Sequence, residues 1–237
     1  MINLFENHRI IAHRGIYDNI KIYENTKEAI KKAIEKKYII EIDIHKTVDN
    51  KIIVFHDYNT KRLFNVNLNI EKSTYDKLNN LKKFHIPTLE EILKLVDGKV
   101  PILIELKQPD KIGALENQTM NILKKYKGQY AIQSFNPQTI YWFKKYYPNV
   151  LRGQLSSKFK NKKMPKIKKI ILSKMLLNII TKPNFISYKY DDLSINSIKK
   201  YQTKGLKVLG WTIRTKEEYD KYKKYYDNLI CENFIYK

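Results

Sequence analysis

Short apolar runs alternate along the chain with segments in which apolar residues recur at three- and four-residue spacing. The runs are rich in isoleucine, leucine and valine, which is typical of strands buried on both faces of a parallel sheet. The spaced segments are typical of helices that bury one face. Eight runs are predicted as the main strands, with a short further piece at 52–55: 9–12, 39–44, 101–106, 130–134, 150–154, 185–188, 207–211 and 229–231.

Helices are predicted in the intervals between these strands. Asn25, Thr88 and Thr215 each stand three residues before a glutamate, a capping pattern that marks where a helix begins. Asn136 is predicted to cap another helix. The predicted helices run from the Asn25 cap to about 37, from 88 onward, and over 113–125, 137–147, 195–204 and 215–226.

This order of elements predicts the fold class, which is α/β. Eight strands separated by helices in 237 residues indicate a (β/α)8 barrel, or TIM barrel, rather than an open sheet. Residues from about 58 to 86 have no clear period and are predicted as a small insertion after strand 2. Because few residues follow the last strand, we expect a short or missing last helix, with the barrel sealed by N-terminal residues or by a partner. One domain is expected over residues 1–237.

The chain is strongly basic, with a formal net charge of +22. Such a charge is typical of proteins that bind nucleic acid, anionic membranes or polyanionic substrates. Lysine is frequent along the whole chain, however, so the charge indicates a compositional bias and disfavours nucleic acid as the primary partner. Residues 158–180 form a basic amphipathic stretch. They are interpreted as a barrel helix after a solvated loop, with an interfacial helix on an anionic membrane surface as the alternative.

The sequence also bears on location. The first eight residues lack the charged-then-apolar order of a signal peptide, and no run approaches the ~20 apolar residues of a membrane span. The one cysteine, Cys231, excludes an internal disulfide. We expect a cytoplasmic protein, peripheral to the membrane if 158–180 rests on lipid.

Charged and imidazole side chains gather at the predicted strand ends. In a (β/α)8 barrel the functional groups lie at the C-terminal ends of the strands, and residues i and i+2 of one strand face the same way. Glu41 and Asp43 are therefore expected to project together, as are Glu105 and Lys107. The other candidates at strand ends are His13, Arg14, His56 and Trp211.

Three carboxylates on adjacent strands, Glu41, Asp43 and Glu105, repel one another unless a cation joins them or one is protonated. Carboxylate oxygens favour a hard ion, so a divalent metal cofactor is predicted. The ion is either Mg²⁺ or Ca²⁺, and the sequence does not distinguish them. Arg14 and Lys107 beside such a cation would form a pocket for phosphate oxygens.

His13 and His56 complete the predicted chemistry. Histidine side chains titrate near neutral pH and therefore serve as acids and bases in catalysis. Carboxylates, a cation, a phosphate clamp and two histidines together predict cleavage of a phosphate ester. The other histidines, His8, His45 and His85, match no motif and are not expected to be catalytic.

The order, spacing and strand placement of eight short motifs resemble those of the glycerophosphodiester phosphodiesterase (GDPD) family over about residues 9–233. These motifs are His13-Arg14-Gly15, Glu24-Asn25-Thr26, Glu41-Ile42-Asp43, His56-Asp57, Ile86-Pro87-Thr88-Leu89-Glu90-Glu91, Glu105-Leu106-Lys107, Gln133-Ser134-Phe135 and Trp211-Thr212.

The resemblance implies a TIM-barrel enzyme that hydrolyses small-molecule glycerophosphodiesters to glycerol 3-phosphate and an alcohol. In the family mechanism, the glycerol 2-hydroxyl attacks through a cyclic phosphate. The resemblance assigns roles to nine residues: acid/base catalysis to His13 and His56, metal binding to Glu41, Asp43 and Glu105, phosphate contacts to Arg14 and Lys107, and the shape of the pocket to Glu24 and Trp211.

Two alternatives stay open. The first is a phospholipase D-like enzyme that acts on intact lysophospholipids or sphingolipids and reaches a membrane surface through 158–180. The second is a protein that binds nucleic acid or another anionic polymer on an inactive barrel. The joint presence of two histidines and three acids argues against the second. The head-group alcohol and the oligomeric state are left open by the sequence.

Overall fold

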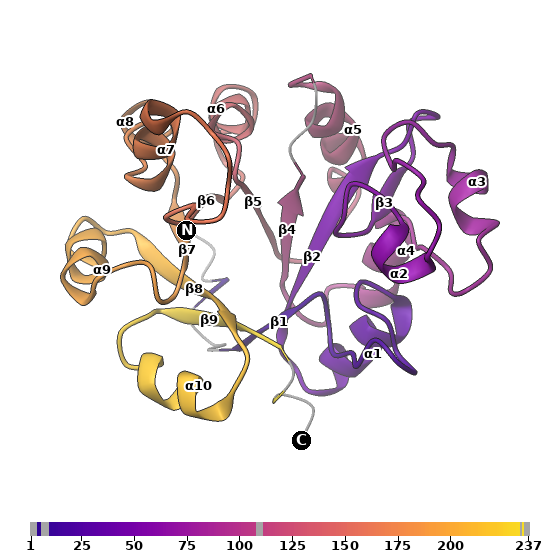
Figure 1. The fold of residues 1–237 in the computed structure, drawn as a ribbon, viewed down its shortest axis with the longest axis horizontal. Coiled ribbons are helices and arrows are strands. Elements are labelled where there is room, and N and C mark those ends of the chain that lie inside the picture. The colour runs from indigo at the N-terminus through magenta and orange to yellow at the C-terminus, as the bar shows by residue number, and fades with distance from the viewer. Residues whose placement is uncertain (1–3, 6–9, 108–110, 233, 235–237) are drawn as a thin grey trace.

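Eight parallel strands close into a barrel in the computed structural model, which describes residues 4–5, 10–107, 111–232 and 234. The closure is made by β1, which pairs with β2 on one side and with β9 on the other. Helices surround the strands on the outside (Figure 1). The predicted (β/α)8 barrel is confirmed. Its strands are β1 Ile10–His13, β2 Ile39–Lys46, β4 Ile102–Leu106, β5 Tyr130–Ser134, β6 Arg152–Ser156, β7 Phe185–Lys189, β8 Lys207–Ile213 and β9 Asn228–Cys231.

Two of the predicted capping boxes are present. Thr88 and Thr215 each accept a hydrogen bond from the backbone N–H of the glutamate three residues on, whose side chain returns the bond to the cap. Asn136 caps α6, as predicted. The helices are α1 Lys27–Glu35, α2 Lys61–Phe64, α3 Tyr75–Asn79, α4 Leu89–Val96, α5 Ala114–Leu123, α6 Pro137–Tyr146, α7 Lys166–Ser173, α8 Asn178–Thr181, α9 Ile195–Gln202 and α10 Lys216–Tyr222.

The predicted cap of α1 is wrong. Thr26, rather than Asn25, precedes the helix, and its hydroxyl accepts a hydrogen bond from the backbone N–H of Ala29. The side chain of Asn25 donates instead to Asp43 Oδ2 at 3.0 Å. The sequence pattern was right about where the helix begins, but the amide next to the cap belongs to the interior of the barrel.

The insertion after β2 is more regular than its sequence suggests. A short strand, β3 (Ile52–Val54), pairs antiparallel with β2, and the helices α2 and α3 follow it before α4. Phe55, Phe64 and Leu78 belong to a small apolar core of this region. Both helices are too short for an apolar period to show, which is why the sequence indicated an irregular segment.

Alternate residues of the strands fill two different cores. On β2, Ile40, Ile42 and Ile44 pack outward among residues of the surrounding helices. Ile39 points into the barrel, and because side chains alternate along a strand, Glu41 and Asp43 point the same way, above it. The inward apolar layer below these acids comprises Leu4, Ile11, Ile39, Leu103, Ala131, Phe185, Leu209 and Ile230.

The N-terminal residues help to seal this layer. Leu4 is buried in it, and the ring of Phe5 lies 5.0 Å from the ring of Phe185, edge to face. This is one of the two ways of sealing that the sequence left open. The expected short or missing last helix concerns 232–237, of which only Glu232 and Phe234 are described, so it stays a prediction.

The basic stretch 158–180 folds as a loop followed by α7 and α8, which lie beside α6 on the outside of the barrel (Figure 1). Among the helices that the structure describes, none is long and apolar enough to cross a membrane. The cytoplasmic location stays a prediction.

Candidate active site

Three buried carboxylates form the centre of the site. Glu41 and Asp43 come from β2 and Glu105 from β4, and the strand register places Asp43 directly beside Glu105. One oxygen from each of the three lies within 4.8 Å of the others, and all three residues are less than a tenth exposed. Burial and the negative charges of Asp43 and Glu105 raise the pKa of Glu41 well above its usual range.

Two cations are packed among these acids. Lys107 Nζ lies 2.9 Å from Asp43 Oδ1 and 2.8 Å from Glu105 Oε1. Arg14 Nε lies 3.3 Å from Asp43 Oδ2, and the Arg14 backbone N–H donates to Glu41 Oε2 at 3.3 Å. Burial alone would raise the pKa of Asp43, but Lys107 and the other positive groups hold it well below its usual range.

Glu24 anchors the guanidinium of Arg14 from the loop before α1. Its Oε1 accepts a hydrogen bond from Arg14 Nη1 at 2.8 Å and another from Arg62 Nη2 at 2.6 Å. Although burial opposes ionisation, the two guanidinium groups and the amide of Asn19 lower the pKa of Glu24 to about 2. Arg14 itself has φ of 58°, so its backbone is in the left-handed region that non-glycine residues seldom adopt. The loop before α1 therefore holds the guanidinium end of Arg14 in place.

His13 is held by a carboxylate that follows the last strand. His13 Nδ1 lies 2.7 Å from Glu232 Oε2, and the hydroxyl of Tyr17 donates to the same oxygen at 3.0 Å. Burial and the neighbouring Arg14 lower the pKa of His13 to about 4. Burial alone would raise the pKa of Glu232, but the hydrogen bond from His13 and the positive charges of His13 and Arg214 lower it to about 2. An ionised carboxylate only accepts hydrogen bonds, so Nδ1 carries the proton and Nε2 is the basic nitrogen of the ring.

His56, which follows β3, is held in a similar way. Its Nδ1 lies 2.5 Å from Asp57 Oδ1, and Asp57 Oδ2 accepts a hydrogen bond from Arg62 Nε at 2.7 Å. His56 lines a cavity of about 570 Å³ at the mouth of the barrel, together with Glu105 and Lys107. Further lining residues include Phe135, Ser157, Phe159, Lys162, Leu172 and Trp211.

Trp211 lines this mouth and carries a hydrogen-bond donor that the described residues leave unused. Its ring packs edge to face against Phe135, with centroids 5.6 Å apart. The indole Nε1 is buried and has no hydrogen-bond partner among the described residues. A buried donor without a partner costs free energy, which a bound oxygen would recover.

The donor set fits a hard divalent cation. Lys107 pairs with Asp43 and Glu105, but no cationic side chain of the described residues forms an ion pair with Glu41. Two oxygens that bind one Ca²⁺ or Mg²⁺ at about 2.0–2.6 Å lie at most about 5 Å apart, and the three carboxylates satisfy this. A cation here would join three oxygen ligands and relieve the charge on Glu41.

The structure thus brings together all nine residues that the sequence singled out. The three acids and four of the other residues, His13, Arg14, Glu24 and Lys107, form one group that is connected by hydrogen bonds, ion pairs or strand pairing. The remaining two, His56 and Trp211, line the mouth cavity. Sequence reasoning missed Glu232 and Arg62 as site residues. Glu232 stands two residues after the inward-facing Ile230, and the same two-residue spacing indicated Glu41 and Asp43. This spacing could have identified Glu232 as a site residue. Arg62 lies in the insertion, where the sequence carries no comparable signal.

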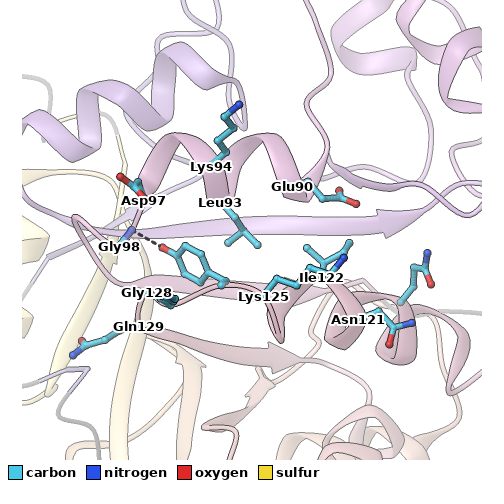
Figure 2. Close-up of a pocket in the computed structure, with 13 residues that line it drawn as sticks. Glu90, Leu93, Lys94, Asp97, Gly98, Asn121, Ile122, Lys125, Gly128 and Gln129 are labelled. Atoms are coloured by element: carbon cyan, nitrogen blue, oxygen red, sulfur yellow. Dashed lines mark hydrogen bonds between the residues drawn. The ribbon is translucent and has the colours of Figure 1, made fainter.

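A larger hollow, of about 820 Å³, lies outside the barrel between α4 and α5. Figure 2 shows Leu93 of α4 and Ile122 of α5 lining it from opposite sides. None of the nine candidate residues lines it, and its charged groups are of mixed sign. The carboxylates, histidines and cations all lie at the barrel mouth, which makes the smaller cavity the candidate active site.

Fold and site together define a (β/α)8-barrel enzyme with its polar groups at the C-terminal ends of the strands. Residues 13–235 match the model of the "Glycerophosphoryl diester phosphodiesterase family". The chain belongs to this family, whose members are phosphoric diester hydrolases, and the resemblance stated from the motifs is confirmed.

Relatives and solved structures agree with this membership. The chain is 26 % identical to YhdW of Bacillus subtilis over 226 residues, which cover 88 % of this chain and 87 % of that protein. It is 30 % identical to a glycerophosphodiester phosphodiesterase of Caldanaerobacter subterraneus over 161 residues, covering 62 % of this chain and 65 % of that protein. The structure of a glycerophosphodiester phosphodiesterase from Thermotoga maritima superposes with a TM-score of 0.76 at 25 % identity, over 94 % of each chain.

Proposed function

We propose that this chain hydrolyses glycerophosphodiesters to glycerol 3-phosphate and an alcohol, with a divalent metal ion and with His13 and His56 as the acid/base pair. Family membership supports the reaction. The observation that carries the roles is the cluster of three carboxylates within 4.8 Å, flanked by Lys107 and by two histidines that are each bound to a carboxylate.

The proposed chemistry follows from where the protons are held. Hydrolysis adds water across a P–O bond. One group must therefore take a proton from the attacking water or hydroxyl group, and another must give a proton to the departing alkoxide. Glu232 and Asp57 each hold the Nδ1 of a histidine, which directs the Nε2 of His13 and of His56 away from those carboxylates. Both rings are thereby oriented for proton transfer. The same pair serves whether water or the glycerol 2-hydroxyl attacks first.

The cationic side chains bind and orient the phosphate. Arg14 is fixed by Glu24 and Asp43, and Lys107 by Asp43 and Glu105, so both positive groups stay beside the acids before substrate arrives. A metal ion on the three carboxylates supplies positive charge, which stabilises the negative charge that builds on the phosphoryl oxygens.

The test is release of glycerol 3-phosphate from glycerophosphocholine and from glycerophosphoethanolamine. The protein is treated with EDTA and then given Mg²⁺ or Ca²⁺ in separate reactions. We expect no release after EDTA and recovery with at least one of the two ions. Release that persists in EDTA, in protein freed of bound metal, would contradict the metal dependence. No release under any condition, in folded protein, would contradict the substrate.

A second candidate function is cleavage of intact lysophospholipids or sphingolipids, and one feature of the mouth favours it. An apolar groove of about 530 Å³ adjoins the mouth cavity and shares Phe135, Lys168 and Leu172 with it. Pro165, Ile167, Ile171 and Leu177 continue its lining. Such a groove suits an acyl chain attached to the glycerophosphodiester. A higher kcat/KM for lysophosphatidylcholine than for glycerophosphocholine would establish this substrate, and the reverse order would exclude it as the preferred one.

A further inference from the structure

The segment between β6 and the middle of α7 combines high positive charge with exposure. Residues 158–170, here called the basic rim, contain seven lysines and no acidic residue. Six of these lysines are exposed to solvent. No acid occurs between this segment and β7 either, so the sequence offers no local partner for most of this charge.

The basic rim is fixed beside the barrel mouth. Phe159 is buried, and its ring lies 6.1 Å from the ring of Phe135. Asp192 accepts a hydrogen bond from the backbone N–H of Lys158 at 2.9 Å and pairs with Lys160 Nζ at 3.0 Å. Phe159, Lys162 and Met164 line the mouth cavity itself. Whatever the rim binds therefore lies next to the entrance of the active site.

Apolar side chains stand exposed among these lysines. Ile167 is 74 % exposed and Ile170 is 49 % exposed. They are three residues apart on α7, so they lie side by side on one face of the helix. The helix has no buried side chain in the described structure. Ile167 also lines the apolar groove that adjoins the mouth, so the exposed isoleucines continue an apolar surface rather than standing alone.

From this combination we propose that the basic rim docks the barrel mouth on an anionic lipid bilayer. Lysines near such a bilayer are attracted by its negative surface potential, and isoleucines gain by leaving water for the boundary of the acyl chains. Nucleic acid would use the lysines but would leave the isoleucines in water, because its phosphate backbone offers them nothing apolar. The docking goes beyond the proposed reaction and does not depend on it, since it is measured without turnover.

The test uses the full chain and vesicles of phosphatidylcholine with or without about 30 % phosphatidylglycerol, separated by sedimentation. We expect binding to the anionic vesicles that falls as NaCl rises from about 50 to about 500 mM, and little binding to phosphatidylcholine alone. The triple variant Lys163→Gln, Lys166→Gln, Lys169→Gln should bind at least about tenfold more weakly. The double variant Ile167→Ser, Ile170→Ser should also lose affinity, and its loss should persist at high salt.

A matched control removes three lysines from the other side of the barrel: Lys31→Gln on α1, Lys36→Gln directly after it, and Lys94→Gln on α4. This control has the same net charge as the rim variant and should bind like the wild-type protein. Equal losses in the two triple variants would overturn the proposal, because the binding would then reflect net charge. A failure of the wild-type protein to bind anionic vesicles would also overturn the proposal. It would be overturned as well if the protein bound double-stranded DNA at about 150 mM salt more tightly than vesicles and if the rim variant weakened that binding. Unchanged melting temperatures show that the variants are folded.

Discussion

Glu232 Oε2 lies 2.7 Å from Nδ1 of His13, although 219 residues separate the two in sequence. The carboxylate fixes both the orientation of the ring and the nitrogen that carries the proton. Glu232→Gln keeps the shape of the side chain and removes its charge. We expect kcat to fall by roughly 10²–10⁴-fold with little change in KM, as when the orienting carboxylate of a catalytic histidine is lost. Steady-state release of glycerol 3-phosphate measures both constants.

The matched control is Glu217→Gln, which removes an exposed carboxylate from α10 in the same part of the chain. It should leave kcat unchanged. If Glu232→Gln retains wild-type kcat while folded, Glu232 has no part in positioning His13.

His13→Ala should abolish most of the activity while the protein stays folded. Loss of a general acid or base costs about 10²–10⁴-fold in rate. His85→Ala is the control, because His85 is half exposed and pairs with Glu91 away from the mouth. The two variants should differ by at least about a hundredfold in kcat and little in melting temperature. Equal activity in both would remove His13 from the mechanism.

Glu41→Gln should reveal the metal site by stability as well as by activity. In EDTA the wild-type protein carries three buried carboxylates with Lys107 paired to only two of them, so the variant is expected to melt at a higher temperature. Added Mg²⁺ or Ca²⁺ should raise the melting temperature of the wild-type protein and leave that of the variant nearly unchanged. Glu90→Gln, an exposed change on α4, should respond to the metal like the wild type. A metal-induced shift of equal size in Glu41→Gln would place the ion elsewhere.

Glu24 makes the stability of the protein depend on pH in the acid range. Its pKa is about 2 in the folded protein, whereas its ordinary value, taken for the unfolded chain, is 4.5. The ionised side chain therefore stabilises the fold above pH 4.5, and this contribution is lost as the pH falls toward 2. Glu24→Gln should lower the free energy of unfolding by up to about 3 kcal/mol at pH 7. The difference from wild type should shrink between pH 4.5 and 2 and vanish below. Denaturant unfolding at several pH values measures it.

The control for this pH dependence is Glu28→Gln, an exposed carboxylate in the first turn of α1. Its effect should be small at every pH. A Glu24→Gln deficit that stays constant down to pH 2 would show that the side chain acts through packing rather than through its charge.

The barrel and most of the site could be predicted because both rest on local rules. Apolar runs identified the strands, and the two-residue period of a strand placed Glu41 with Asp43 and Glu105 with Lys107. Closure of the barrel then brought these pairs to one mouth. The capping pattern at Thr88 likewise needs only four consecutive residues, and it was confirmed.

What the sequence did not show depends on contacts between distant segments. Asn25 has the chemistry of a helix cap, and only the position of Asp43 in space explains why its amide turns inward. Arg62 reaches Glu24 from the insertion, across 38 residues, and no periodicity connects the two. Glu232 could have been found by its place after Ile230, but its partner His13 becomes evident only when β9 pairs with β1.

Gly15 closes the turn that presents His13 and Arg14. Comparing alanine at Gly15 with alanine at Gly205 separates the cost of backbone strain from the cost of a steric clash. Gly15 has φ of +82° and Gly205 has φ of +77°, so alanine at either position adopts a left-handed backbone at a cost of about 1–2 kcal/mol. A Cβ at Gly15 would also lie 2.7 Å from the backbone of Ala29, whereas nothing lies within 4 Å of one at Gly205. Gly15→Ala should therefore lower the free energy of unfolding by at least about 2 kcal/mol more than Gly205→Ala. It should also lower activity, because relief of the clash moves the Arg14 N–H away from Glu41. Equal losses of stability in the two variants, measured by denaturant unfolding, would mean that the turn yields without disturbing α1.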